Sequence, residues 1–208
     1  MKFIVVKNEF DFKKIRKIKD SKIIIFIKDN IDFQRSIEPI NMRNSDVIIL
    51  GNNKTLSNIL IYDDFNNSYN TGIFSVVRNL YVRNLNVINA HIHGGEVCGI
   101  LAGDVREKFT GIDIGLYGFV NGRNICGGFV GICDFIKTQA TYFKGEVSGK
   151  SIIGSVAGIA NEADIDTIVT NEYDLDKLEK IGCLNSEILA GTSKKYKNSK
   201  WTKYCYYE

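Results

Sequence analysis

The sequence predicts an all-β fold: a single-domain, right-handed parallel β-helix of roughly 27-residue coils with a short N-terminal helical cap. Three observations support this prediction. A six-residue glycine motif recurs as CGILAG, CGGFVG and IGSVAG at residues 98–103, 126–131 and 153–158. With a weaker upstream copy, TGIFSV, the first glycines of the four copies lie 27, 28 and 27 residues apart. Between the copies, the apolar residues form short, β-branched runs of strand length rather than helical patterns. Self-similarity at this period is typical of a solenoid.

The repeated letters have a physical reason in such a fold. Equivalent strands of successive coils stack about 4.8 Å apart, so equivalent inward side chains lie directly on one another. We therefore expect columns of aliphatic residues in the core, and a column of glycines at a corner where a Cβ would clash. Cys98 is expected above Cys126, as two thiols that fill the core. The expected columns are Val97, Ile125 and Ile152; Phe74, Leu101, Phe129 and Val156; Ser75, Ala102, Val130 and Ala157; and Gly103, Gly131 and Gly158.

The ends of a solenoid must be covered, because an open end pairs with other chains. Residues 1–30 are predicted to hold an N-terminal cap and the first strand, residues 46–170 the repeat coils, and residues 171–208 a C-terminal cap or tail. Within 8–19, Phe10, Phe12, Ile15 and Ile18 have near-helical spacing, which predicts a short amphipathic helix with Asn8 or Asp11 as its N-cap. Residues 174–189 predict a second short helix or an irregular coil, and residues 195–208 a final strand or an end cover.

The charge is uneven along the chain. The net charge is +3, but residues 1–28 hold nine Lys or Arg and three Asp or Glu, and residues 189–208 hold five Lys and one Glu. Basic ends around an acidic centre can steer a charged partner. The five cysteines are odd in number and lack CxxC spacing, so they indicate neither a disulfide framework nor a zinc site. We expect a cytoplasmic protein, because no signal peptide or membrane-spanning run is evident.

Several stretches together resemble the GLUG-repeat family of β-solenoids. KNEFDFKKIRKI followed by IIIFIKDNIDF resembles the entry segment of that family, and ILGNNKTLSNILI and GIFSVVRNLYVRNLNVINAHI resemble two of its coils. CGILAGDV and CGGFVGIC resemble its glycine motif, and WTKYCYYE its ending. The resemblance runs from about residue 3 to 208. It implies a right-handed parallel β-helix, used as a repeat module in bacterial surface proteins and large secreted proteases, without a catalytic role of its own.

Groups of residues that could carry chemistry are sparse. Asp104, Asp113 and Asp134 could lie on one side of the coils, but they are out of register, and we interpret them as solvated turn residues. His91 and His93 are two residues apart in a strand, so we expect both imidazoles on the outer face, without the further ligands that a metal site needs. We predict no enzyme activity, no catalytic residues, no metal and no cofactor.

The predicted function is therefore non-enzymatic macromolecule binding. We expect a small intracellular protein that binds and blocks or scaffolds a host protein complex, such as a phage-encoded inhibitor of a nucleic-acid-guided defence system. The alternatives are an adhesin or surface-protein repeat module and a carbohydrate-active β-helix enzyme. The candidate partner-binding residues are acidic, Glu162, Asp164, Asp166, Glu172, Asp174 and Asp176, or basic and aromatic, Lys200, Trp201, Lys203, Tyr204, Tyr206 and Tyr207.

The partner class follows from the same residues. A protein partner is favoured, and the basic termini leave nucleic acid as the alternative. No membrane association is expected, and the oligomeric state is left open.

Overall fold

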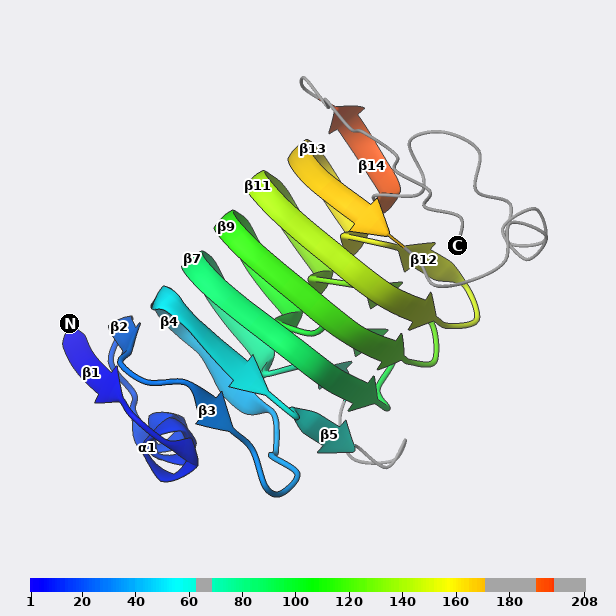
Figure 1. Ribbon diagram of the computed structural model, residues 1–208. Helices are drawn as coiled ribbons and strands as arrows, with labels where there is room; N and C mark the ends of the chain where they lie inside the picture. The colour runs from blue at the N-terminus through cyan, green and yellow to red at the C-terminus, as the bar shows by residue number, and fades with distance from the viewer. Residues whose placement is uncertain (63–68, 171–189, 197–208) are drawn as a thin grey trace.

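The computed structural model describes residues 1–62, 69–170 and 190–196. These residues form a parallel β-solenoid of about five turns, as the repeat predicts (Figure 1). One sheet has the strand order β1-β2-β4-β7-β9-β11-β13-β14, with β3 beside β4 and β5 beside β7, and a second sheet has the order β12-β10-β8-β6. All the strand pairs are parallel.

The strands fall into three groups. The long strands, which bend around the coil, are β4 (Ile40–Ser57), β7 (Phe74–His93), β9 (Ala102–Asn121), β11 (Val130–Ser148) and β13 (Ala157–Thr170). The second sheet consists of β6 (Asn70–Thr71), β8 (Val97–Cys98), β10 (Ile125–Gly127) and β12 (Ile152–Gly154). The remaining strands are β1 (Lys2–Val6), β2 (Lys22–Ile27), β3 (Ile31–Asp32), β5 (Leu60–Tyr62) and β14 (Ala190–Tyr196).

The glycine motif joins the two sheets at a tight corner. A Cβ on Gly127 would lie 2.0 Å from the Val130 carbonyl oxygen and 2.6 Å from the Gly158 nitrogen, so only glycine fits. The expected stacking is confirmed for Ile125, whose register partners are Val97 and Ile152, and for Cys126, whose partner is Cys98.

Two expected columns are wrong at their first members, since Phe74 is expected to align with Leu101 and Ser75 with Ala102. Phe74, not Ser75, is the register partner of Ala102. Gly72 is followed by one residue fewer before the long strand begins than Gly99 is, so the strand of the first copy starts one position earlier. The Phe74 ring therefore takes the fully buried core position above Ala102.

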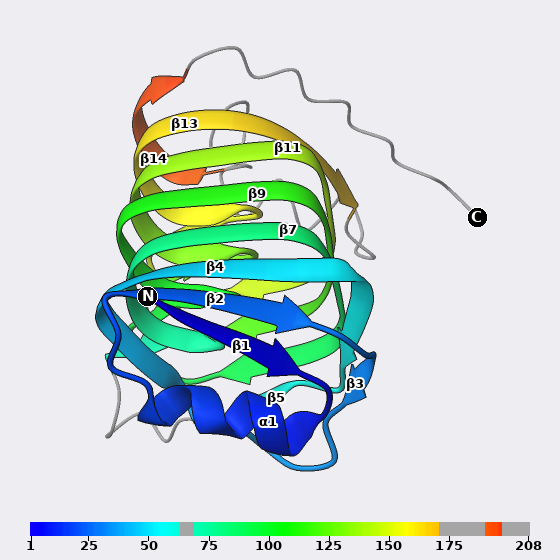
Figure 2. The same ribbon diagram turned by 90° about the vertical axis from the view of Figure 1, so that its left-hand side faces the viewer.

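The N-terminal helix is shorter than expected. It comprises α1 (Glu9–Lys14), followed by one 3-10 turn over Ile15–Lys17. Asn8 is its N-cap, and its Oδ1 accepts a hydrogen bond from the Asp11 amide at 3.0 Å. Seen from the N-terminal end, α1 lies beside the first strands and below β1 (Figure 2).

The apolar face of α1 differs from the prediction at one position. Phe12 and Ile15 are buried as expected, and the Phe12 ring packs edge-on against Phe33 at 5.2 Å between centroids. Phe10, however, is 70% exposed. A residue two positions before Phe12 lies about 200° away around the helix, so the two rings cannot share one face.

The predicted C-terminal features lie mostly outside the described residues. Residues 171–189 and 197–208 lie outside the described residues. They include all of 174–189, for which the sequence predicts a second short helix or an irregular coil. Of the predicted tail, only residues 195 and 196 fall in a described strand, β14, which pairs with β13. Within the described part of the chain, no helix has the length and apolarity that a membrane crossing requires.

Candidate protein-binding face

Three of the predicted acidic binding residues lie on β13. Ile165 is fully buried between Asp164 and Asp166, as expected from the alternation. The Asp164 carboxylate forms an ion pair with Lys137 at 3.1 Å, and the Asp166 carboxylate accepts a hydrogen bond from the backbone amide of Ala140 at 3.2 Å.

The carboxylates of Asp164 and Asp166 therefore have partners on β11, the neighbouring long strand. Ala140 is a corner residue with a positive φ of 50°, so Asp166 helps to hold that corner. Glu162 is half-buried beside Phe135 in the register. The other nine predicted binding residues lie outside the described residues: Glu172, Asp174, Asp176, Lys200, Trp201, Lys203, Tyr204, Tyr206 and Tyr207.

The carboxylates considered for chemistry are apart from one another in the register. Asp104 has Val76 and Ile132 as its neighbours on the two adjacent strands, and Asp113 lies at a corner with a φ of 51°. Burial raises the pKa of the Asp104 carboxyl above its ordinary value of 3.8, against the opposing effect of nearby arginines. Among the described residues, no three His, Cys, Asp or Glu side chains are placed to hold a metal ion.

A different group of side chains forms the most distinctive surface of the described chain. Six adjoining outward positions on the first three strands of the main sheet are apolar, and we call them the outer apolar face: Phe3 and Val5 of β1, Ile24 and Phe26 of β2, and Ile48 and Leu50 of β4. The next outward column, Lys22 of β2 and Asp46 of β4, is charged. Phe3, Ile24 and Ile48 form one register column, and Val5, Phe26 and Leu50 form the next. The six side chains therefore form one continuous apolar surface on the outer side of the sheet.

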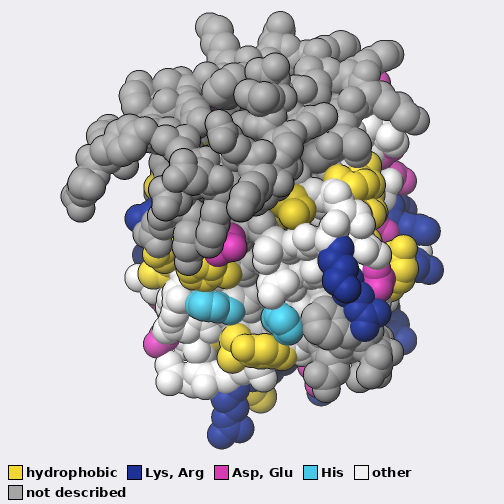
Figure 3. All heavy atoms as spheres, turned by 90° about the vertical axis from the view of Figure 1, so that its right-hand side faces the viewer, with side chains coloured by type: hydrophobic (Ala, Val, Ile, Leu, Met, Phe, Trp, Pro, Cys, Tyr) yellow, Lys and Arg dark blue, Asp and Glu magenta, His cyan; other side chains and the backbone are white. Residues whose placement is uncertain are grey.

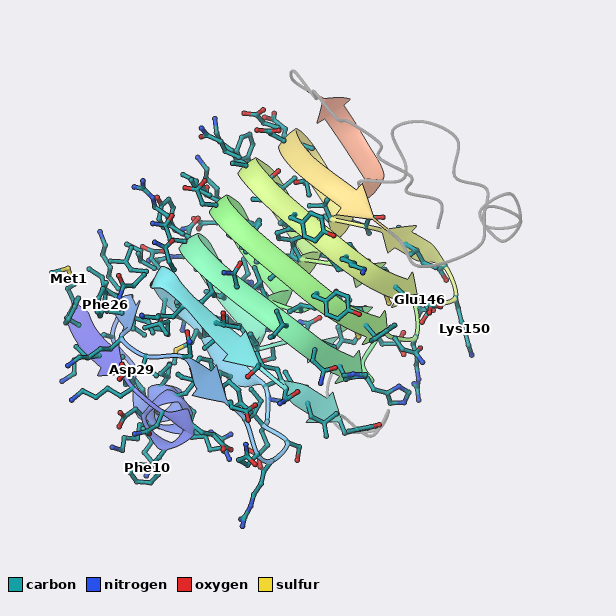
Figure 4. The ribbon with its side chains drawn as sticks, viewed as in Figure 1. Met1, Phe10, Phe26, Asp29, Glu146 and Lys150 are labelled. Atoms are coloured by element: carbon teal, nitrogen blue, oxygen red, sulfur yellow. The ribbon has the colours of Figure 1, made fainter. Side chains whose placement is uncertain are left out.

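The exposure of this face is highest at its outermost strand. Phe3 is 56% exposed and Val5 39%, and the Phe3 and Phe26 rings stack with their centroids 6.5 Å apart. In Figure 4, Met1 and Phe26 lie together at the N-terminal end of the sheet, and Phe10 projects from α1 on another side. Contiguous exposed apolar surface is a feature that protein interaction sites have in common.

The outer surface becomes more polar along the solenoid. The column that begins with Phe3, Ile24 and Ile48 continues with Tyr81, Thr110, Lys137 and Asp164 on the successive long strands. Equivalent positions of the coils thus hold apolar residues at the N-terminal end of the solenoid and charged residues at its other described end. This change shows that the outer apolar face is not a requirement of the coil itself.

Polar ladders border the outer apolar face. The Arg78 side chain donates a hydrogen bond to the Asp46 carboxylate at 2.7 Å, and this bond lowers the pKa of the Asp46 carboxyl. The Asn79 amide donates to the same carboxylate at 2.9 Å and to Glu107 at 2.7 Å. These groups are paired with one another across three coils.

The charge around the first strands is strongly positive. All three acidic residues of the segment 1–28 are in ion pairs within that segment: Glu9 with Lys13, Asp11 with Lys14, and Asp20 with the N-terminal ammonium. Six lysines of the same segment have no ion pair within 4 Å among the described residues: Lys2, Lys7, Lys17, Lys19, Lys22 and Lys28. Lys7 and Lys22 lie near the carboxylates of Asp11 and Asp46 without forming a close ion pair. The outer apolar face therefore borders a surface with an excess of positive charge.

The sequence reasoning above missed this face, although the sequence contains a signal for it. A strand with one face in the core and one in water alternates apolar and polar residues. The stretches KFIVV, KIIIFI and VIIL are instead apolar at consecutive positions. Such runs indicate that both faces of the strand are apolar, and therefore that the outer face either packs on something or is exposed.

A second surface carries the two histidines, which lie on one face as expected (Figure 3). His91 packs against Phe119 at 5.1 Å between ring centroids, and His93 against Tyr62 at 5.5 Å. The His91 ring is hydrogen-bonded to the Asn89 side chain at 3.0 Å, and the Asn89 amide donates to Asn58.

Of these residues, His91, Asn89 and Asn58 line part of a shallow hollow. It has a volume of about 230 Å³, and its other walls include Phe33, Gln34 and Arg35. Flat rings beside amide groups and a guanidinium are suited to polar, ring-shaped ligands such as sugars.

Comparisons with known proteins support the fold and go no further. No family model matches the chain, and no curated protein matches it. The resemblance to the GLUG-repeat family therefore stays a prediction. A solved structure from Bacteroides ovatus, named a "putative immunoglobulin A1 protease", superposes with a TM-score of 0.50 over 82% of this chain and 77% of its own, at 12% sequence identity. At that identity, the likeness shows a shared parallel β-solenoid fold.

Proposed function

We propose that the chain is a non-enzymatic protein-binding module that contacts its partner through the outer apolar face. The observation that carries this proposal is the run of six outward apolar side chains on β1, β2 and β4, which the later coils do not repeat. Burying such a surface against a partner removes it from water, at roughly 25 cal/mol per Å² of apolar area. The hydrogen-bonded sheet holds the backbone of these residues in place, so binding need order only their side chains.

The setting of this function is a further part of the proposal. We infer that the module acts inside a cell, where it blocks or scaffolds a host protein complex, as an inhibitor carried by a phage or mobile element would do. Its support is the odd number of cysteines without disulfide spacing, which fits a reducing compartment inside a cell. Within the described residues, Cys98, Cys126 and Cys133 form no disulfide.

The proposal is tested by capture of a partner from the lysate of the natural host, with and without nuclease. The tagged chain is compared with the double variant Ile24→Thr/Ile48→Thr, which keeps β-branched residues but makes the outer face polar. Ile132→Thr is the matched control, because Ile132 is an outward isoleucine of β11 away from this face.

A stoichiometric protein that survives nuclease, binds the wild type and the control, and is lost from the double variant supports the proposal. Recovery of nuclease-sensitive material only, or equal capture by all three proteins, would overturn it.

A second candidate function is a sugar-binding surface module. The observation that favours it is the histidine and aromatic surface above, where His91 pairs its ring with Phe119 and His93 with Tyr62, and where His91 lines a hollow. The shared fold with the Bacteroides protein is compatible with such a role and adds no ligand. A glycan array distinguishes the candidates: binding that is lost in Phe119→Ala and kept in Ile24→Thr/Ile48→Thr would favour the sugar-binding module.

A further inference from the structure

We propose that the open edge of β1 is the docking site for one extended segment of the partner protein, with an apolar centre and acidic flanks, which adds to the main sheet as a further strand. This inference rests on the proposed function and deepens it, because it names the contact and the chemistry of the partner. Strand addition to a sheet edge is a general mode of peptide recognition, in which backbone hydrogen bonds supply affinity and alternate side chains supply specificity.

The backbone of β1 has one paired side and one open side. β1 ends the order of the main sheet, with β2 as its single strand neighbour among the described residues. The Val6 carbonyl oxygen accepts a hydrogen bond from Lys28 at 2.8 Å, so the Val6 backbone groups point toward the β2 side. Because these groups alternate in direction along a strand, those of Phe3 and Val5 point toward the open edge.

The side chains that accompany those open backbone groups are the two most exposed of the outer apolar face. Phe3 and Val5 therefore offer both unpaired amide groups and bare apolar surface at one place. An edge strand of this kind pairs with another chain unless it is protected, and natural edges are protected by charges, prolines, bulges or covering segments. In Figure 2, β1 lies in front of β2 and β4, with α1 below it rather than across it.

The charges near the edge select the partner. Lys2 begins β1 and Lys7 directly follows it, so a segment lying along the edge meets a cation at each end. Lys28 directly follows β2 in the same way, whereas Lys22 lies opposite Asp46 of β4. Carboxylates at the flanks of the incoming segment would neutralise these lysines, whereas its apolar centre would extend the surface of Phe3 and Val5.

A second copy of this chain fits the edge less well. Antiparallel pairing of two β1 strands about Ile4 would set the N-terminal residue of each copy opposite Lys7 of the other and repeat the excess of positive charge on both sides. Like charges placed opposite each other destabilise a strand pair. A nucleic acid would use the lysines but would leave the open amide groups and the apolar rings without partners.

The test uses a short fluorescent peptide with a Val-Thr-Val-Thr-Val centre and a pair of glutamates at each end. A matched peptide carries lysines at those ends, and a poly-dT oligonucleotide stands for nucleic acid. Binding to the full chain is measured by fluorescence anisotropy, and the oligomeric state of the free protein by light scattering. We expect the glutamate peptide to bind a monomeric protein and the other two probes not to bind.

Three variants locate the contact. Val5→Pro removes an amide that faces the open edge and spares the bonds to β2, and should weaken peptide binding about tenfold, as expected for the loss of about one well-made hydrogen bond. Phe3→Ser should weaken binding several-fold, whereas Phe10→Ser removes an even more exposed ring from α1 and should leave binding unchanged. Thermal unfolding shows whether each variant is folded.

The remaining outcomes overturn the inference. These are no binding of the glutamate peptide, equal binding of the lysine peptide or the oligonucleotide, no effect of Val5→Pro in a folded variant, or a dimer that Val5→Pro dissociates. Failure of the inference differs from failure of the proposed function: a partner captured equally by wild type and Val5→Pro, but lost in Ile24→Thr/Ile48→Thr, keeps the protein-binding face and excludes the edge.

Discussion

Single residues decide where each coil of this solenoid turns. Asn84, Asp113 and Ala140 occupy equivalent corners of β7, β9 and β11 with φ values of 53°, 51° and 50°. Asparagine and aspartate tolerate this left-handed backbone better than other residues with a Cβ. Glycine is required at position 127 for a different reason. Its φ does not lie in the left-handed region, but the neighbouring backbone leaves no space for a Cβ.

This difference leads to a prediction for Gly127→Ala. The new methyl group would collide with the backbone of Val130 and Gly158, which cannot move without breaking the stack, so we expect a loss of about 2–3 kcal/mol in the free energy of unfolding. Gly115→Ala is the control, because there the methyl group meets only the end of the exposed Asn86 side chain at 2.7 Å. Urea unfolding measures both, and equal stabilities would contradict the packing argument.

Asp104 allows a prediction about pH. Burial raises the pKa of its carboxyl in the folded state, so this group favours folding fully below its unfolded pKa of 3.8, and the contribution is lost as the pH rises through the folded pKa. At pH 7 the half-buried carboxylate therefore costs stability. We expect Asp104→Asn to raise the melting temperature at pH 7 and to have no effect well below pH 3.8.

The control for this prediction is Asp29→Asn, which makes the same charge change at an exposed position. A melting temperature that rises equally in both variants would point to net charge rather than to burial. A gain for Asp104→Asn that persists at low pH would contradict the assigned cause.

At the scale of the element, α1 shows how a short helix covers the end of a solenoid. Its six residues are too few for a stable isolated helix, so it depends on the Asn8 cap and on packing. Phe12 provides most of that packing through its edge-on contact with Phe33. The stability of α1 therefore depends on its contact with the core of the solenoid.

Phe12→Ala is accordingly predicted to be costly. Removal of a fully buried ring should lower the free energy of unfolding by about 3 kcal/mol, whereas Phe10→Ala should change it by less than about 0.5 kcal/mol. Chemical denaturation of the two variants tests this contrast. Equal losses would mean that Phe10 is buried in solution.

At the scale of the whole molecule, stability comes from the contacts of each coil with the next. In such a stack, interior coils have two neighbours and end coils have one. We expect hydrogen exchange to be slowest for the amides of β9 and faster toward β1, with the Phe3 and Val5 amides among the fastest because they face the open edge. Exchange measured residue by residue by NMR tests this order, and uniform protection from β1 to β9 would contradict it.

The outer apolar face also belongs to this scale. It exists because β1, β2 and β4, which are separated by other segments of the chain, lie side by side in register. The stacking also turns the acidic residues of β13 toward Lys137 and the Ala140 corner, where they act within the coil. The acidic residues of β13, which were chosen from local charge in the sequence, are therefore not the residues that form the outer apolar face.

The sequence by itself determined the repeating architecture of this protein. The spacing of the glycine motifs, the aliphatic columns and the Asn8 cap are local or periodic features, and periodic features stack on themselves in one way. The tertiary structure alone decided the register of Phe74 and the open edge of β1. These depend on which strands become neighbours across some 25 residues of chain and on the length of each connection, and neither is encoded in a local pattern.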